Sequence, residues 1–226
     1  MPERVTRRSP IQHLLEARGA ELREFNDSCF AVRIQPEEVE AQASETLAMC
    51  DLSGLQKLGV KGRDADDWLR SNGTNVPAGI FETAELPESG VIVRVGADEF
   101  FLEEGIGSAM VKTLSTKVDS HDGEMYRVEH EEATFLLVGT RADKVLAQTC
   151  GINFRKVAAH QVVFTRVAGV SCGVYQNSTV NPAWRFWVDP AYAEYLWETL
   201  VEICESLDGQ VIGVGCLYPQ LVVCPH

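Results

Sequence analysis

The chain has 226 residues, of which 45% are hydrophobic and 23% charged, a composition typical of a folded globular protein. Its formal net charge is −13 and its pI is about 4.8, so most of its surface repels the phosphates of nucleic acids and anionic membranes. We therefore expect neither a nucleic-acid-binding nor a membrane-binding protein.

The N-terminal segment and the cysteines indicate a cytoplasmic protein. Charged residues interrupt every apolar cluster of the first 22 residues before a secretory signal could form, and no apolar run approaches the roughly 20 residues that a membrane span needs. The seven cysteines are an odd number, widely spaced and without a C-x-x-C pair, as expected of reduced, mostly buried thiols.

The first sixty residues predict alternating helices and strands. A short helix begins at Pro10 and ends at Gly19, and a strand follows over residues 21–34. A second helix over residues 36–49 has acids in its first turn, where the helix dipole favours them. Residues 52–61 then predict a strand or strand pair that Gly62 ends.

A third helix begins at Asp64, because Ala65, Trp68 and Leu69 follow the i, i+3, i+4 spacing of one buried helical face. Gly73 ends it. Three acids occupy its first turn, near the positive end of the dipole: Asp64, Asp66 and Asp67. We interpret them as the start of a helix and not as catalytic groups.

The same pattern occurs a second time. The segment from Gly62 to Leu69 matches the segment from Gly139 to Leu146, at an offset of 77 residues, and each follows an apolar strand. A Gly-x-Asn turn follows each helix, ending at Asn75 and at Asn153. Such self-similarity indicates a duplicated unit of supersecondary structure.

The second half contains a longer helix and a β-rich tail over residues 211–223. A core stripe is predicted on the helix: Tyr192, Tyr195, Leu196, Leu200, Ile203 and Leu207. Strands interleaved with helices, with hairpins as well as crossovers, predict an α+β fold of two related lobes. The first lobe takes residues 1–115 and the second takes residues 116–226 with the tail.

At this point the chain resembles a known superfamily. DLSGLQKLGVKGRDADDWL and NVPAGIFETAELPESGVIVRVGADEFFLE resemble the N-terminal portion of the glycine cleavage T-protein (aminomethyltransferase) superfamily. VLAQTCGINF, VVFTRVAGVSCGVYQ and RFWVDPAYAEYLWETL look more like the gamma subunit of heterotetrameric sarcosine oxidase. The resemblance covers about residues 9–207 and implies a folate-binding fold of two pseudo-repeated sheet-plus-helix lobes, without the C-terminal barrel of the aminomethyltransferases.

The resemblance also implies where a folate would bind. In the aminomethyltransferases, the turn after the leucine-rich helix supplies an aspartate that contacts the reacting folate nitrogen, and the matching residue here is Asn75. A glutamate holds the pterin, whereas the matching stretch from Tyr175 to Trp184 contains no acid. Because an amide cannot take a proton as a carboxylate does, no catalytic residue is predicted. Asn75, Tyr175 and Trp184 are the candidate cofactor contacts.

Aromatic residues gather in the sequence around one hairpin and helix: Tyr175, Trp184, Trp187 and Trp197. They are interpreted as core and rim of the second lobe. Two alternatives stay open, in which some of them anchor a partner subunit, or Tyr175 and Trp184 stack on a pterin.

Cysteine chemistry offers two further kinds of site. Four potential metal ligands near the C-terminus have spacings that match no common zinc module, so no metal site is predicted: Cys204, Cys216, Cys224 and His226. A nucleophilic pair of Cys150 or Cys172 with His130 or His160 stays open, although both cysteines fall in apolar segments.

The preferred hypothesis is a non-catalytic gamma-type subunit of a heteromeric, flavin-dependent sarcosine (N-methyl amino acid) oxidase or dehydrogenase, linked to folate one-carbon metabolism. It binds no cofactor tightly, and flavin and NAD are expected on larger flavoprotein subunits. Tetrahydrofolate binding and a homodimer of the isolated chain stay open. The alternative is a stand-alone tetrahydrofolate-dependent aminomethyltransferase or demethylase that uses a relocated acid: Asp51, Glu82 or Glu85.

Overall fold

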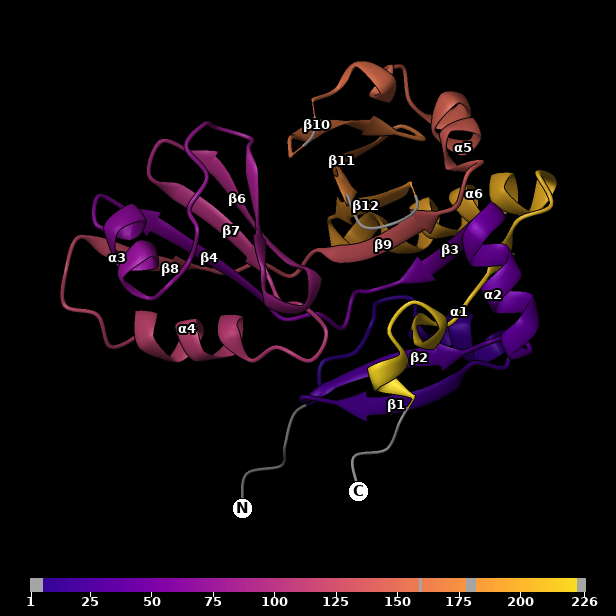
Figure 1. Cartoon of the computed structure of the whole chain (residues 1–226), viewed down its shortest axis with the longest axis horizontal. Helices are drawn as coiled ribbons and strands as arrows, with labels where there is room; N and C mark the ends of the chain where they lie inside the picture. The colour runs from indigo at the N-terminus through magenta and orange to yellow at the C-terminus, as the bar shows by residue number, and fades with distance from the viewer. Residues whose placement is uncertain (1–5, 159, 178–181, 223–226) are drawn as a thin grey trace. The chain divides into compact units, whose positions relative to one another are not determined.

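The structure is a computed structural model that describes residues 6–158, 160–177 and 182–222. The chain forms two compact units. The first takes its described residues from Met1–Gly54, Glu132–Ala159 and Val163–His226, and the second from Leu55–Glu131 and His160–Val162. The first unit has a six-stranded sheet and a two-stranded hairpin, and the second is built on a five-stranded sheet (Figure 1). This confirms the predicted α+β fold.

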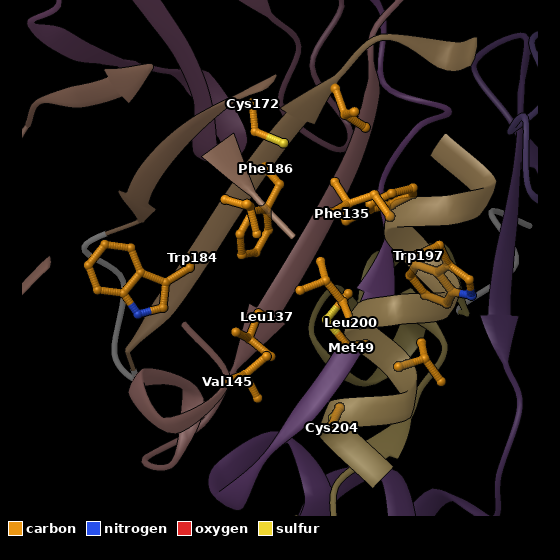
Figure 2. Close-up of a cluster of buried hydrophobic side chains, with 14 of the residues drawn as sticks. Met49, Phe135, Leu137, Val145, Cys172, Trp184, Phe186, Trp197, Leu200 and Cys204 are labelled. Carbon is orange, nitrogen blue, oxygen red and sulfur yellow. The ribbon is translucent and has the colours of Figure 1, made fainter. Parts of the chain in front are cut away.

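The six-stranded sheet has the order β10-β11-β12-β9-β3-β13. These strands are Val162–Val167, Val170–Asn177, Ala183–Val188, Ala133–Val138, Ala48–Asp51 and Gln210–Val211. One face packs against α5 (Ala142–Thr149) and α6 (Ala193–Ser206) (Figure 2). Helix α1 (Gln12–Ala17) adds Leu15 to the same core. The main hydrophobic core of the first unit therefore lies between this face and its helices.

The buried face of α6 differs from the predicted stripe at its N-terminal end. Its core residues are Ala193, Leu196, Trp197, Leu200, Val201 and Cys204. Tyr192 and Tyr195 are both 56% exposed, so their prediction as core residues is wrong. The spacing of apolar residues along this helix was compatible with either of two adjacent faces being buried. In the structure the buried face is the one that includes Trp197 and Val201.

The second unit is a five-stranded antiparallel sheet with the order β5-β6-β7-β4-β8. The strands are Thr83–Leu86, Gly90–Gly96, Glu99–Glu103, Lys57–Gly62 and Met125–Val128. Helices α3 (Ala65–Ser71) and α4 (Met110–Val118) bury their apolar residues against one face of this sheet (Figure 1). The predicted α3 is thus confirmed, and Gly73 after it has a φ of +85°.

The duplication is visible in the topology. Each repeat runs as strand, strand, helix, three strands and helix, from β3 to α4 and from β8 to α6. The first strand of each repeat pairs in the sheet of the other, because β3 lies beside β9 and β8 lies beside β4. The division predicted at residues 115 and 116 falls inside α4, near the junction of the repeats, whereas the compact units follow the exchanged strands.

Two glycines at matching positions of the repeats make this strand exchange possible. Gly62 and Gly139 have φ values of +137° and +104°. A Cβ on Gly62 would lie 2.2 Å from the carbonyl oxygen of Glu124, just before β8, and one on Gly139 would lie 2.4 Å from the carbonyl carbon of Thr46, just before β3. Only glycine allows both this backbone conformation and this approach.

The N-terminal region differs from its prediction in two places. The strand expected over residues 21–34 is a hairpin of β1 (Glu21–Phe25) and β2 (Ser28–Arg33). Its turn residues Asn26 and Asp27 have φ values of 49° and 64°, as a tight hairpin turn requires. The helix expected over residues 36–49 ends earlier, because α2 spans Glu37–Thr46 and the buried β3 follows.

The tail is less regular than predicted. After α6 it forms the short strand β13 and two 3-10 turns, at Val214–Cys216 and Pro219–Leu221. The prediction of a β-rich tail is therefore wrong for the residues that the structure describes. The buried carboxylate of Glu40 in α2 fixes the tail: one oxygen accepts from the backbone N–H of Gly213 at 2.8 Å and from those of Ile34 and Gln35. Among the described residues, no helix is long and apolar enough to span a membrane.

Candidate functional site

The three predicted cofactor contacts lie in different parts of the fold. Asn75 is an exposed residue of the loop after α3 in the second unit. Tyr175 and Trp184 lie on the neighbouring strands β11 and β12 of the first unit. The register pairs Tyr175 with Arg185 and Trp184 with Gln176, so the two aromatic side chains point to opposite faces of the sheet. Their rings therefore do not face a common site.

The loop that carries Asn75 is held by two arginines. Arg94 donates from Nε to the carbonyl of Pro77 at 2.9 Å, and Arg70 donates from Nη2 to the carbonyl of Val76 at 3.2 Å. Both guanidinium groups form ion pairs with the carboxylate of Asp66 in the first turn of α3. Asp66 therefore begins the helix and also fixes the loop through Arg70 and Arg94.

The second repeat has a related arrangement. Asp143 occupies the position of Asp66, at the same offset of 77 residues, and forms an ion pair with Arg155. The side chain of Asn153 accepts a hydrogen bond from the backbone N–H of Arg155 at 3.2 Å, which starts the 3-10 turn Phe154–Lys156. In both repeats an aspartate of the first helical turn thus steadies the segment after the helix through arginine.

Trp184 lies next to this second segment. Its ring meets the ring of Phe154 with centroids 5.0 Å apart, and a cavity of about 490 Å³ beside it includes Leu146, Cys150 and Ile152 in its lining. The residue is 6% exposed, and its indole nitrogen has no hydrogen-bond partner among the described residues. Trp184 therefore forms part of the wall of an open, mostly apolar cavity. The carboxylate in its lining is that of Asp143, which is paired with Arg155.

Tyr175 belongs to an aromatic layer on the opposite face of the sheet. Its ring stacks on that of Trp187, with centroids 6.1 Å apart and planes 4° apart. Trp187 pairs with Gly173, where a Cβ would lie 3.1 Å from both Trp187 and Phe164. Tyr175 and Trp187 are 2% and 5% exposed. With Trp184 and Trp197 also buried, the interpretation of these four aromatic residues as core holds.

Two of the three acids considered as relocated catalytic groups accept hydrogen bonds within the fold, and the third is exposed to solvent. Asp51 is 5% exposed and accepts from the backbone N–H and the hydroxyl of Ser53, at 3.1 and 2.6 Å. Glu82 accepts from the backbone N–H of Gly79 at 2.8 Å within the loop that follows Asn75. Glu85 is exposed on β5.

Three buried cysteines, Cys50, Cys172 and Cys204, do not have the properties of nucleophiles. Burial raises the pKa of Cys172 to about 12 and that of Cys204 to about 12, and it raises the pKa of Cys50 well above its ordinary value. A reactive cysteine needs a lowered pKa, so these thiols are inert in the fold. Within the described residues no group of three potential metal ligands exists, and Cys224 and His226 lie outside those residues.

Sequence reasoning missed two charged contacts in the second unit. One is the link from Asp66 to Arg94, which lie 28 residues apart. The other is the pair of Lys57 and Glu103, whose side chains are fully buried with Nζ 3.3 Å from Oε2. A charged residue inside the apolar segments LQKLGV and FFLEEG is a signal for such a pair, because a buried charge needs a partner. Their mutual pairing depends on the register of β4 and β7.

Known proteins share this architecture. A family model described as the GCVT N-terminal domain matches residues 12–219. The fold is similar to the glycine cleavage system aminomethyltransferase T from Bartonella henselae, with a TM-score of 0.73 and 16% identity over 97% of this chain and 64% of that chain. It is also similar to a chain of the heterotetrameric sarcosine oxidase from Corynebacterium sp. U-96 in complex with pyrrole 2-carboxylate, with a TM-score of 0.64 and 19% identity over 90% of this chain and 97% of that chain.

These comparisons assign the fold and the family. No curated protein sequence matches the chain, and at such identities the two structural similarities concern the fold alone. The chain spans less than two thirds of the aminomethyltransferase and nearly all of the sarcosine oxidase chain. Because the family model covers most of the sequence and the fold is aminomethyltransferase-like, the chain belongs to the family of the GCVT N-terminal domain.

Proposed function

We propose that this chain is a non-catalytic, gamma-type subunit of a heteromeric, flavin-dependent oxidase or dehydrogenase of sarcosine or another N-methyl amino acid, linked to folate one-carbon metabolism. Flavin and NAD reside on larger partner subunits. The near end-to-end similarity to a chain of a heterotetrameric sarcosine oxidase supports this proposal. The aminomethyltransferase, in contrast, is matched over 64% of its length.

The observation that carries the proposal is the amide at position 75. Two arginines and Asp66 hold the loop of Asn75 in place, so the loop is well built although its expected acid is absent. The acid nearest in sequence on that loop, Glu82, binds the backbone N–H of Gly79. The loop thus keeps its form without the carboxylate that proton transfer or a developing cation would need.

A pterin stacked between the rings of Tyr175 and Trp184 does not fit these residues. Tyr175 and Trp184 face opposite sides of their sheet, and both are almost fully buried. The two rings offer no common stacking surface. We therefore assign no reaction step to this chain, and its role is to bind its partners.

The test is a titration of the isolated full chain with tetrahydrofolate under reducing, anaerobic conditions, followed by tryptophan fluorescence and by calorimetry. The chain has four tryptophans, among which Trp184 would report a ligand near the cavity beside α5. We expect no saturable signal in the micromolar range and no flavin absorbance near 450 nm. Saturable binding at micromolar ligand together with turnover that Glu82→Gln abolishes would establish the enzyme alternative instead.

A further inference from the structure

A groove of about 370 Å³ lies between α1 and α6 of the first unit. Its inner wall is apolar and includes Leu14, Ala17, Trp197 and Val201. Its rim is charged and consists of Arg18, Glu198, Glu202 and Glu205. The groove is therefore an apolar hollow with a mainly acidic border.

Trp197 places an unused hydrogen-bond donor in this groove. The residue is 1% exposed and its ring packs against Phe135, with centroids 5.0 Å apart. Figure 2 shows its indole nitrogen on the side of the ring that faces away from Phe135. No hydrogen bond of this indole is formed within the described residues, and its nitrogen is not one of the fully buried atoms that lack a partner. The N–H is therefore accessible from the groove, where water or a ligand oxygen can accept from it.

The charges along the groove are only partly balanced. Arg18 pairs with Glu205 at 2.7 Å at one end, and His13 approaches Glu194 at 3.6 Å at the other. Glu198 and Glu202 lie between these pairs, are exposed, and have no ion pair in the described part of the chain. They are one helical turn apart and therefore project to the same side of α6.

We propose that this groove docks a basic, amphipathic segment of a partner polypeptide. An apolar side chain of the segment enters between α1 and α6, an oxygen of the segment accepts from the Trp197 indole, and two lysines or arginines pair with Glu198 and Glu202. From Glu194 to Glu205 the surface is about 16 Å long, or three helical turns. The inference names the docking surface that the proposed function requires, and rests on that function only for the partner's identity.

Charge selects this occupant over others. Anionic lipid and nucleic acid are repelled by the exposed glutamates. A second copy of this chain carries the same net charge of −13, which opposes self-association through an acidic groove. A basic segment gains both apolar burial and charge pairing, and paired charges at the rim also accelerate association at low salt.

The experiment uses the full chain and a synthetic 15-residue peptide that has leucines on one helical face and lysines and arginines beside them. Calorimetry measures its binding to the unchanged chain, to Glu198→Gln/Glu202→Gln, and to the control Glu38→Gln/Glu45→Gln. The control removes the same charge from exposed positions of α2. An otherwise identical peptide with glutamates in place of the basic residues tests the sign of the charge.

We expect the basic peptide to bind the unchanged chain saturably. Its affinity for the Glu198/Glu202 variant should be about tenfold weaker, since exposed ion pairs contribute about 0.7 kcal/mol each. Its affinity for the control variant should be unchanged. Ala17→Arg, which fills the groove and supplies its own cation, should also abolish binding without lowering thermal stability. No saturable binding, equal affinity for both double variants, or a dimer that Ala17→Arg disrupts would overturn the inference. Because the peptide replaces the partner, the result does not depend on whether that partner is a flavoprotein.

Discussion

At the scale of single residues, the three acids at the start of α3 show what a sequence pattern can and cannot predict. Their position in a first helical turn followed from the spacing of Ala65, Trp68 and Leu69, and the helix is confirmed. The further role of Asp66 could not be predicted, because it depends on Arg94, which a β-hairpin brings back to α3. Local periodicity predicts a helix start but not a contact across 28 residues.

Asp66→Asn is expected to lower the free energy of unfolding by about 1–2 kcal/mol, because it removes two charge-assisted contacts at a partly exposed site. Asp67→Asn is the matched control, since Asp67 lies in the same helical turn but is exposed. Urea denaturation of both variants measures the difference. Equal losses would mean that the helix dipole alone explains the acids and that the link to Arg94 contributes nothing.

Lys57→Met is expected to cost about 3–5 kcal/mol, because it leaves the buried carboxylate of Glu103 without its cation. Glu103→Leu should cost a similar amount. The double variant should be clearly more stable than the sum of the two losses predicts, since no charge then stays buried without its partner. Chemical denaturation of the three variants gives the coupling energy, and strict additivity would contradict a direct pair.

At the scale of secondary structure elements, the repeat could be predicted from the sequence, whereas the exchange of strands between the two sheets could not. The offset between Gly62 and Gly139 followed from the sequence, and both glycines have the same positive-φ conformation. The exchange of β3 and β8 between the sheets depends on pairing between distant segments. The hairpin turn at Asn26 and Asp27 carried a recognisable signal. The predicted second helix, in contrast, was extended into β3, because a fully buried strand has no alternation.

Gly139→Ala and Gly62→Ala are each expected to lower stability by at least 3 kcal/mol, because the added Cβ meets backbone atoms and the φ is unfavourable for alanine. Gly151→Ala is the control, since nothing lies within 4 Å of its Cβ position and its φ is not positive. Thermal unfolding should shift strongly for the first two variants and by less than about 1 kcal/mol for the third. A small effect at Gly139 would argue against the tight approach of Thr46.

At the scale of the whole molecule, the buried thiols predict how stability responds to alkaline pH. Burial raises the pKa of Cys172 and of Cys204 from 9.0 to about 12, so the folded state holds these protons more tightly than the unfolded state. Their contribution is complete below pH 9 and is lost as the pH rises from 9 towards 12. At most, each thiol changes stability by about 1.4 kcal/mol per pH unit.

Urea denaturation between pH 8 and pH 10.5 checks this slope. Lysines and tyrosines also titrate in this range, so the comparison is between the unchanged chain and Cys204→Ala, whose absolute stability is lower but whose alkaline loss should be smaller. Identical slopes would show that the thiol of Cys204 ionises as readily in the folded protein as in the unfolded one.

The composition and the family resemblance predicted the class of the fold, because both depend on the pattern of apolar residues and on the repeated glycines. That pattern does not require the polar groups of the site to be the same. The candidate site was only partly predictable. Asn75 lies in a well-supported loop as its motif implies, but the strand register that places Tyr175 and Trp184 on opposite faces follows only from the pairing of β11 with β12. A shift of one residue reverses the face of every side chain on a strand, and the sequence does not specify that register.

The central claim is that this chain binds partners which carry the redox chemistry. The most direct measurement is isolation of the tagged full chain from its native cells at its natural abundance, followed by identification of the co-eluting polypeptides, their stoichiometry and their flavin content. The account predicts a stoichiometric complex with larger, flavin-containing subunits that oxidises sarcosine or a related N-methyl amino acid, while the separated chain is colourless and inactive. A chain that elutes alone and transfers or removes a one-carbon group from its substrate with tetrahydrofolate would contradict it.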